Sequence, residues 1–159
     1  MNIKKMRGWI IALAIVVVLA LPIVLSDRRT FNNIDDNETF LKVINSDKVN
    51  MVVFGQDTCI WCTRFKVSMK AVVKKYDLDN IYYVNLSTLK NSEWDKILDS
   101  DLMIPESCTK EDKDAHPISE GFGTPLTIFT KNGESIDCIG GHVDADKLAI
   151  ILKSVNIIE

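Results

Sequence analysis

The feature that most constrains this chain is a pair of cysteines, Cys59 and Cys62, between a predicted strand and a predicted helix. The residues before the pair, Val49 to Phe54, are apolar and rich in β-branched side chains, which is typical of a short buried strand. From Cys59 to Tyr76 the apolar side chains recur at helical spacing. Three residues make almost one helical turn, so the pattern predicts two thiols on one side of a helix start, close enough to form a disulfide.

This position suits thiol chemistry because the unpaired N–H groups and the dipole at a helix start favour a thiolate. We therefore predict that Cys59 is the exposed attacking thiol. Cys62 leads into the apolar face that contains Phe65 and Met69, so we predict that it is the shielded resolving thiol. In that mechanism Cys59 forms a mixed disulfide with a substrate, and Cys62 then displaces the bound partner.

The remaining pattern alternates helices and strands and contains no internal repeat. Asn132-Gly133 between two apolar runs predicts a tight hairpin near the C-terminus. The predicted elements are helices at 35–45, 59–76, 92–101 and from about 144, and strands at 49–54, 81–86, 126–130 and 135–139. This order predicts an α/β fold with a central sheet of about four strands.

Three segments resemble members of the thioredoxin superfamily over about residues 35–155: VVFGQDTCIWCTRF, GTPLTIFTKNGE, and GGH before the last helix. The resemblance implies a thioredoxin fold, in which a central mixed sheet is flanked by helices. Within the superfamily, the chain is most similar to membrane-anchored bacterial thioredoxin-like proteins, including the bacteriocin transport accessory proteins.

The resemblance also implies a substrate-binding surface beside the cysteines. In the family, the peptide bond that corresponds to Thr124-Pro125 is cis, stands next to the CxxC motif and offers backbone to an extended substrate. The alternative is a proline that merely opens an edge strand. Trp61 provides an aromatic surface for partners in one interpretation and packs internally in the other.

Two positions depart from the thioredoxin pattern. Val53 stands where thioredoxins carry a buried acid, and Thr58 stands where they carry a tryptophan before the first cysteine. The Ile60-Trp61 dipeptide matches neither the pair of reducing thioredoxins nor that of strong oxidants. The redox direction therefore stays open among oxidant, reductant and isomerase.

Cys108 and Cys138 lie outside the CxxC motif. We expect a structural disulfide between them because disulfides persist outside the cytosol, with two free thiols as the alternative. His116 and His142 could join cysteines around a metal, but the chain has no second pair with ligand spacing, so we predict no metal site and no cofactor.

An uncharged apolar run of 17 residues, Trp9 to Leu25, precedes the predicted domain. At about 1.5 Å per residue it is just long enough to cross a bilayer core, so we expect a single-pass anchor at residues 8–26, with a cleaved signal peptide as the alternative. Basic residues in the first seven positions favour a cytoplasmic N-terminus and an extracytoplasmic domain at the cell membrane. The expected parts are a basic tail at 1–7, the anchor at 8–26, a tether at 27–34, and a thioredoxin-like domain at 35–159 with an insertion at about 100–120.

The charge balance, 19 basic against 22 acidic residues, argues against a nucleic-acid partner. We predict a membrane-tethered thiol-disulfide oxidoreductase that acts on protein or peptide thiols and disulfides, with an unknown redox partner. The alternative is a non-enzymatic accessory protein that presents Trp61 and the Cys108 loop to a secreted peptide or an exporter.

Overall fold

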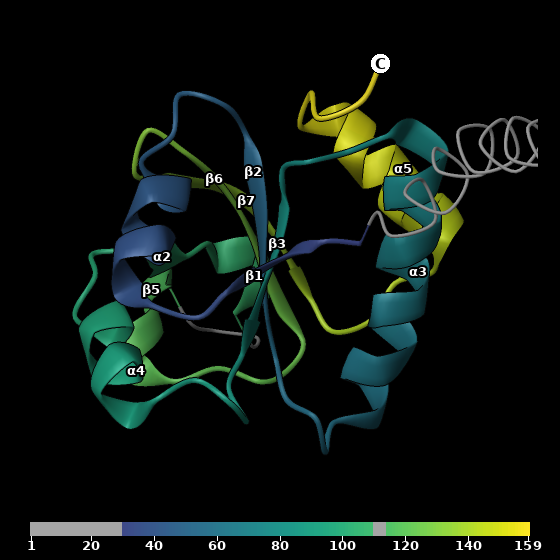
Figure 1. The fold of residues 1–159 in the computed structure, drawn as a ribbon. Helices are drawn as coiled ribbons and strands as arrows, with labels where there is room; N and C mark the ends of the chain where they lie inside the picture. The colour runs from purple at the N-terminus through teal and green to yellow at the C-terminus, as the bar shows by residue number, and fades with distance from the viewer. Residues whose placement is uncertain (1–29, 110–113) are drawn as a thin grey trace, which may run out of the picture. The chain divides into compact units, whose positions relative to one another are not determined.

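A five-stranded mixed sheet organises the computed structural model, which describes residues 30–109 and 114–159 (Figure 1). The strand order is β1-β3-β2-β6-β7; β1, β3 and β2 are parallel, and β6 and β7 are antiparallel to their neighbours. The strands are β1 (Asn32–Ile34), β2 (Asn50–Gly55), β3 (Ile81–Asn85), β6 (Leu126–Lys131) and β7 (Glu134–Gly140).

Two pairs of helices cover the two faces of this sheet (Figure 1). The helices are α2 (Asn37–Ile44) and α4 (Asn91–Leu98) on one face, and α3 (Ile60–Tyr76) and α5 (Ala145–Ser154) on the other. The β2 strand lies in the middle and is buried along its whole length. Its side chains alternate between two cores: Met51 and Val53 pack with α3 and α5, whereas Val52 and Phe54 pack with α2. This double burial explains the continuous apolar run in the sequence.

The sheet has one strand more than predicted, because β1 lies in the segment that we assigned to a tether. Asn32 to Ile34 pairs in parallel with Tyr82 to Val84 of β3, and the Ile34 side chain is buried. Only the residues before this strand remain available for a tether. Three residues are too few to show a strand period, so the sequence pattern did not reveal it.

The insertion also contains short regular elements, although the sequence pattern predicts no strand in it. Its strands β4 (Met103–Ile104) and β5 (His116–Pro117) form a second, antiparallel sheet of their own. Two short 3-10 helices, η1 (Glu106–Cys108) and η2 (Ile118–Glu120), flank them. Elements of two or three residues give no detectable hydrophobic period, and the tertiary pairing therefore decides them.

The predicted basic tail and membrane anchor, residues 1–7 and 8–26, lie outside the described residues. Within residues 30–109 and 114–159, no helix has both the length and the apolar character needed to cross a membrane.

A close approach between β2 and β3 occurs just before the CxxC loop. A methyl group added at Gly55 would lie 2.8 Å from Cζ of Tyr83 and closer still to its hydroxyl oxygen. Tyr83 is only 2% exposed, and its hydroxyl has no hydrogen-bond partner in the described part of the chain. Burial, together with the negative charge of Asp57, raises the pKa of Tyr83 to about 12, so this phenol stays protonated at neutral pH.

Replacement of Gly55 by alanine tests this packing. We expect Gly55→Ala to lower the free energy of unfolding by about 1–3 kcal/mol, because the added methyl group overpacks against the Tyr83 ring. The loss shrinks in a Tyr83→Phe background, and Tyr83→Phe alone is close to neutral because it removes an unpaired buried hydroxyl. Urea denaturation of the four proteins measures the cycle, with Gly123→Ala as a control at a site where a methyl group meets no atom within 4 Å. Equal losses at Gly55 and Gly123 would contradict the steric explanation.

A carboxylate between α2 and α4 makes stability depend on pH. The Asn37 N–H donates to Oε2 of Glu93 at 2.9 Å, and Lys96 Nζ donates to Oε1 at 2.8 Å, so these bonds hold the Glu93 pKa below its ordinary value of 4.5. The ionised Glu93 carboxylate stabilises the fold fully above pH 4.5 and loses this effect as the pH falls through the lowered folded-state pKa.

We expect Glu93→Gln to unfold at a lower urea concentration than the wild type at pH 7, and this difference in urea midpoint to narrow at pH 3. The exposed Glu120→Gln serves as the control; a gap for Glu93→Gln that is the same at both pH values would contradict the assignment.

Candidate functional site

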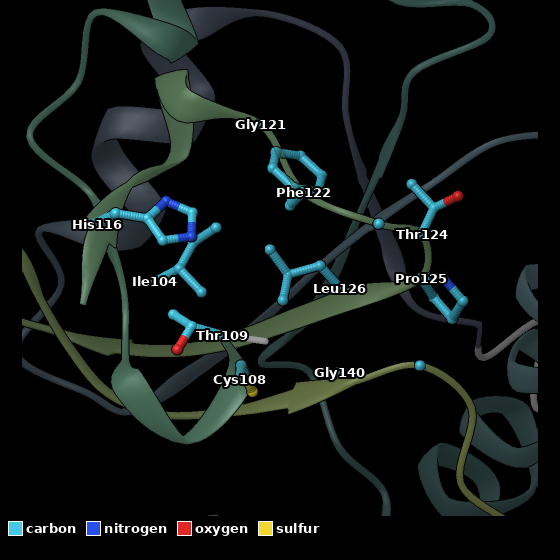
Figure 2. A pocket seen from close by; sticks show the side chains of 12 residues that line it. Ile104, Cys108, Thr109, His116, Gly121, Phe122, Thr124, Pro125, Leu126 and Gly140 are labelled. Atoms are coloured by element: carbon cyan, nitrogen blue, oxygen red, sulfur yellow. The ribbon is translucent and has the colours of Figure 1, made fainter. Parts of the chain in front are cut away.

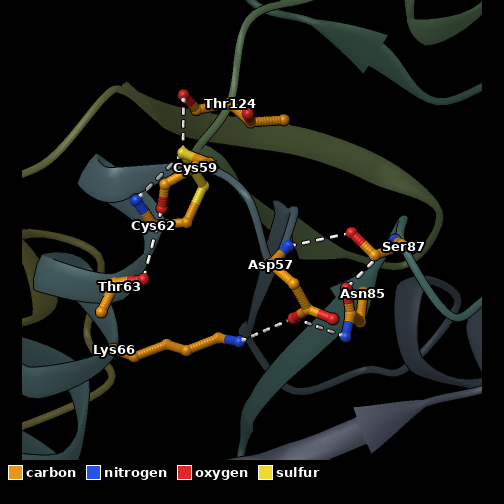
Figure 3. Close-up of a disulfide and its surroundings, with 8 residues drawn as sticks. All are labelled: Asp57, Cys59, Cys62, Thr63, Lys66, Asn85, Ser87 and Thr124. Atoms are coloured by element: carbon orange, nitrogen blue, oxygen red, sulfur yellow. Dashed lines mark hydrogen bonds and ion pairs between the residues drawn. A yellow bond between two sulfur atoms is a disulfide. The ribbon is translucent and has the colours of Figure 1, made fainter.

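The two cysteines of the CxxC motif form a disulfide at the start of α3, with their Cα atoms 5.2 Å apart (Figure 3). Cys59 is the residue that caps the helix: its backbone is extended, and its Sγ accepts a hydrogen bond from the Cys62 N–H at 3.1 Å. Because this donor belongs to the helix start, it favours negative charge on the Cys59 sulfur once the disulfide is reduced.

The two sulfurs differ in their access to solvent. Cys62 is 1% exposed, whereas Cys59 is only partly buried. This difference has the direction that an exposed attacker and a shielded resolver require. The assignment of these two roles stays a prediction.

The register of the sheet brings Thr124 and Pro125 to the disulfide. Phe54 of β2 pairs with Leu126 of antiparallel β6, so the residues before Leu126 lie beside the loop that leads to Cys59. The peptide bond between Thr124 and Pro125 is cis, and the Thr124 carbonyl oxygen lies 3.5 Å from Cys59 Sγ (Figure 3). The structure thus places the Thr124 backbone beside Cys59, and the binding of substrate by Thr124 and Pro125 stays a prediction.

Trp61 is half exposed and lies in an aromatic group beside the disulfide. Its ring centroid lies 6.1 Å from that of His142, and the Arg64 guanidinium lies 4.8 Å from the centroid of the indole. His142 also contacts Phe65 edge to face, with centroids 6.2 Å apart. From the sequence we considered His142 only as a metal ligand, although it belongs to the GGH segment that resembles the family.

A polar network holds the loop before Cys59 from the other side (Figure 3). The Asp57 N–H donates to Ser87 Oγ at 2.9 Å, and Asn85 Nδ2 donates to Asp57 Oδ1 at 3.1 Å. Lys66 Nζ lies 3.8 Å from the same carboxylate oxygen and 4.3 Å from the centroid of the Tyr83 ring. Sequence reasoning missed Lys66, Asn85 and Ser87 because they reach Asp57 from α3 and from the end of β3, which are distant in the chain.

The buried acid of thioredoxins has no counterpart here at the position of Val53, which is completely buried. The charges nearest to the cysteines in sequence that the structure describes, Asp57 and Arg64, are both exposed.

A second disulfide joins Cys108 of η1 to Cys138 of β7, with Cα atoms 6.0 Å apart, and the expected pairing is thus present in the structure. It attaches the insertion to the sheet, and Ser107 Oγ lies 3.2 Å from Cys138 Sγ. Among the described residues, no group of three or more histidine, cysteine or acidic side chains is placed to hold a metal ion.

The structure thus gathers Cys59, Cys62, Trp61 and the Thr124-Pro125 bond at one end of the sheet. Cys108 and Cys138 are not part of this group; their disulfide joins η1 of the insertion to β7.

The comparisons with solved structures give several thioredoxins. The thioredoxin of Malassezia sympodialis is 18% identical with a TM-score of 0.56, covering 80% of this chain and 92% of its own. The thioredoxin of Fasciola hepatica is 15% identical with a TM-score of 0.53, covering 79% and 99%. The thioredoxin of Trypanosoma brucei brucei is 12% identical with a TM-score of 0.52, covering 80% and 90%. At these identities the likeness shows the fold alone.

A comparison with curated protein sequences gives no match. A family model described as a thioredoxin-like domain matches residues 37–156, which include both cysteines of the CxxC motif, the Thr124-Pro125 bond and helices α2 to α5. The chain therefore belongs to the thioredoxin-like domain family.

Proposed function

We propose that this protein is a membrane-tethered, extracytoplasmic thiol-disulfide oxidoreductase that exchanges disulfides with protein or peptide clients. The observation that carries the proposal is the Cys59-Cys62 disulfide at the start of α3. In it, the sulfur of the partly exposed Cys59 accepts a hydrogen bond from the backbone N–H of the buried Cys62. The thioredoxin-like fold with this cysteine pair supports the general chemistry.

In the reductive direction, the Cys59 thiolate attacks one sulfur of a client disulfide. A Cys59-client disulfide forms, the client bond breaks, and the first client thiolate leaves. Cys62 then loses its proton and attacks Cys59 Sγ, which closes the Cys59-Cys62 disulfide and releases the second client thiolate. The client gains two electrons and the dithiol loses two. The oxidative direction runs the same steps in reverse, and the geometry is compatible with both.

Two features support a location outside the cytoplasm. The apolar segment at 8–26 follows a basic N-terminus, as in a single-pass anchor whose following domain is exported. The Cys108-Cys138 disulfide is of a kind that persists in oxidising compartments. The closer resemblance to bacteriocin transport accessory proteins stays a prediction.

Trapping of clients tests the chemistry. Cys62→Ala leaves an attacking thiol without a resolving thiol, so we expect it to accumulate mixed disulfides with client proteins on non-reducing gels. Cys59→Ala should abolish trapping and turnover.

The reverse pattern, with trapping by Cys59→Ala alone, would show that the two roles are exchanged. If neither variant traps a client and the wild type shows no disulfide exchange, the accessory-protein alternative replaces the enzyme.

Protease treatment of intact cells tests the location. Protease added outside should remove the domain from Phe31 onward while residues 1–7 stay protected, because the basic tail favours the cytoplasmic side. A cytoplasmic protein monitored in the same cells provides the control for lysis. A protected domain would contradict the orientation, and a mature protein that begins near Asp27 would contradict the retained anchor.

A further inference from the structure

A pocket of about 570 Å³ lies directly beside the proposed client-binding backbone (Figure 2). It occupies the space between the insertion and the start of β6. Its lining comprises Ile104, Cys108, Thr109, His116, Gly121, Phe122, Gly123, Thr124, Pro125, Leu126, Gly140 and Gly141. This volume is within the range of about 300–1,000 Å³ that is usual for ligand pockets.

Thr124 links the pocket to the Cys59-Cys62 disulfide. That residue lines the pocket, and its carbonyl oxygen lies 3.5 Å from Cys59 Sγ. A client joined to Cys59 passes Thr124, and an extended chain advances about 3.3 Å per residue. The residues next to the client cysteine are therefore the ones that reach the pocket.

The lining determines which side chain fits. Ile104 and Leu126 are buried and form an apolar floor, and Phe122 closes one side (Figure 2). No lysine, arginine, aspartate or glutamate belongs to the lining that the structure describes, and His116 is its one titratable side chain. Ile104, Phe122 and Leu126 offer apolar contacts to a side chain that enters the pocket, so the pocket suits an apolar side chain.

The second disulfide holds the outer wall of this pocket. Cys108 lines it, and the bond to Cys138 attaches η1 to β7 at the edge of the sheet. Met103 at the start of the insertion also accepts a hydrogen bond from Ser135 of β7. Without the disulfide, the segment that carries Cys108 and Thr109 loses its covalent attachment to the sheet.

We propose that this pocket is a specificity subsite that binds an apolar side chain adjacent to the client cysteine, and that the Cys108-Cys138 disulfide maintains it. The inference rests on the proposed function, because the client reaches the pocket through its bond to Cys59. It adds a substrate class, namely extended peptide segments in which an apolar residue neighbours the cysteine. It also gives the second disulfide a role in client choice.

Peptide disulfides test the subsite. The substrates are short peptides whose single cysteine is bonded to a chromophoric thiol, with leucine or aspartate either before or after that cysteine. Full-length Cys62→Ala, with Cys108-Cys138 intact by thiol counting, attacks the peptide sulfur, forms the Cys59-peptide disulfide and releases the chromophoric thiolate. We expect the second-order rate constant to favour leucine over aspartate by at least about tenfold at one of the two positions.

Two further variants, each made in the Cys62→Ala protein, test whether the preference for leucine arises in the pocket. Gly123 lines the pocket, and a Cβ added there meets no atom within 4 Å. We therefore expect Gly123→Leu to occupy part of the pocket, and the leucine-to-aspartate ratio to fall toward one. Removal of the second disulfide by Cys108→Ala with Cys138→Ala should lower the same ratio. Ser119→Leu, an exposed position in η2 that does not line the pocket, should retain it.

The symmetrical disulfide of the chromophore is a substrate without a peptide, so it tests the oxidoreductase activity separately from the subsite. If it reacts with Cys62→Ala while all peptides react at one rate, the oxidoreductase stands and the subsite is wrong. A preference that survives in Gly123→Leu would place recognition elsewhere. If neither the chromophore disulfide nor any peptide reacts, the proposed function itself fails.

Discussion

The burial of β2 on both faces is the constraint on which the site depends. A strand covered by helices on both sides must end where its apolar run ends, and here that point is Gly55, four residues before Cys59. Its parallel pairing with β3 and antiparallel pairing with β6 then place three chain segments at one edge: the CxxC loop, the end of β3 and the Thr124-Pro125 bond. The backbone register, rather than any contact between the cysteines and their neighbours, sets this arrangement. The tight packing of Gly55 against Tyr83 secures the point at which the loop leaves the sheet.

Within this frame, the two cysteines acquire different environments from one short segment. Cys59 lies at the helix start, where its sulfur accepts the Cys62 N–H, whereas Cys62 begins the buried side of α3. The position that carries a buried acid in thioredoxins is Val53 here, and the ion pair between Asp57 and Lys66 lies at the surface. Surface pairs of this kind contribute little stability, so we interpret Asp57 mainly through its hydrogen bonds to Asn85 and Ser87. Electrostatic support for a Cys59 thiolate therefore comes chiefly from the helix start.

The insertion adds structure outside the five-stranded sheet and its helices. It adds a two-stranded sheet beside β7, and the Cys108-Cys138 disulfide attaches it there. The pocket between this addition and β6 is lined in part by Thr124, whose carbonyl oxygen lies 3.5 Å from Cys59 Sγ. In the function that we propose, reactivity depends on the start of α3, and client choice depends on the insertion and its disulfide.

The sequence by itself determined the elements whose causes are local. The apolar run of β2, the helical period after Cys59, the Asn132-Gly133 turn and the last helix from about residue 144 each depend on residues within a few turns or one strand. The positions of Cys59 and Cys62 follow from that local pattern. Tertiary structure decided the rest: β1 exists because β3 is there to pair with it, β4 and β5 exist only as partners of each other, and Asn85, Ser87 and Lys66 meet Asp57 from separate elements. The pocket likewise depends on the insertion, because its lining combines residues of the insertion with residues of β6 and β7.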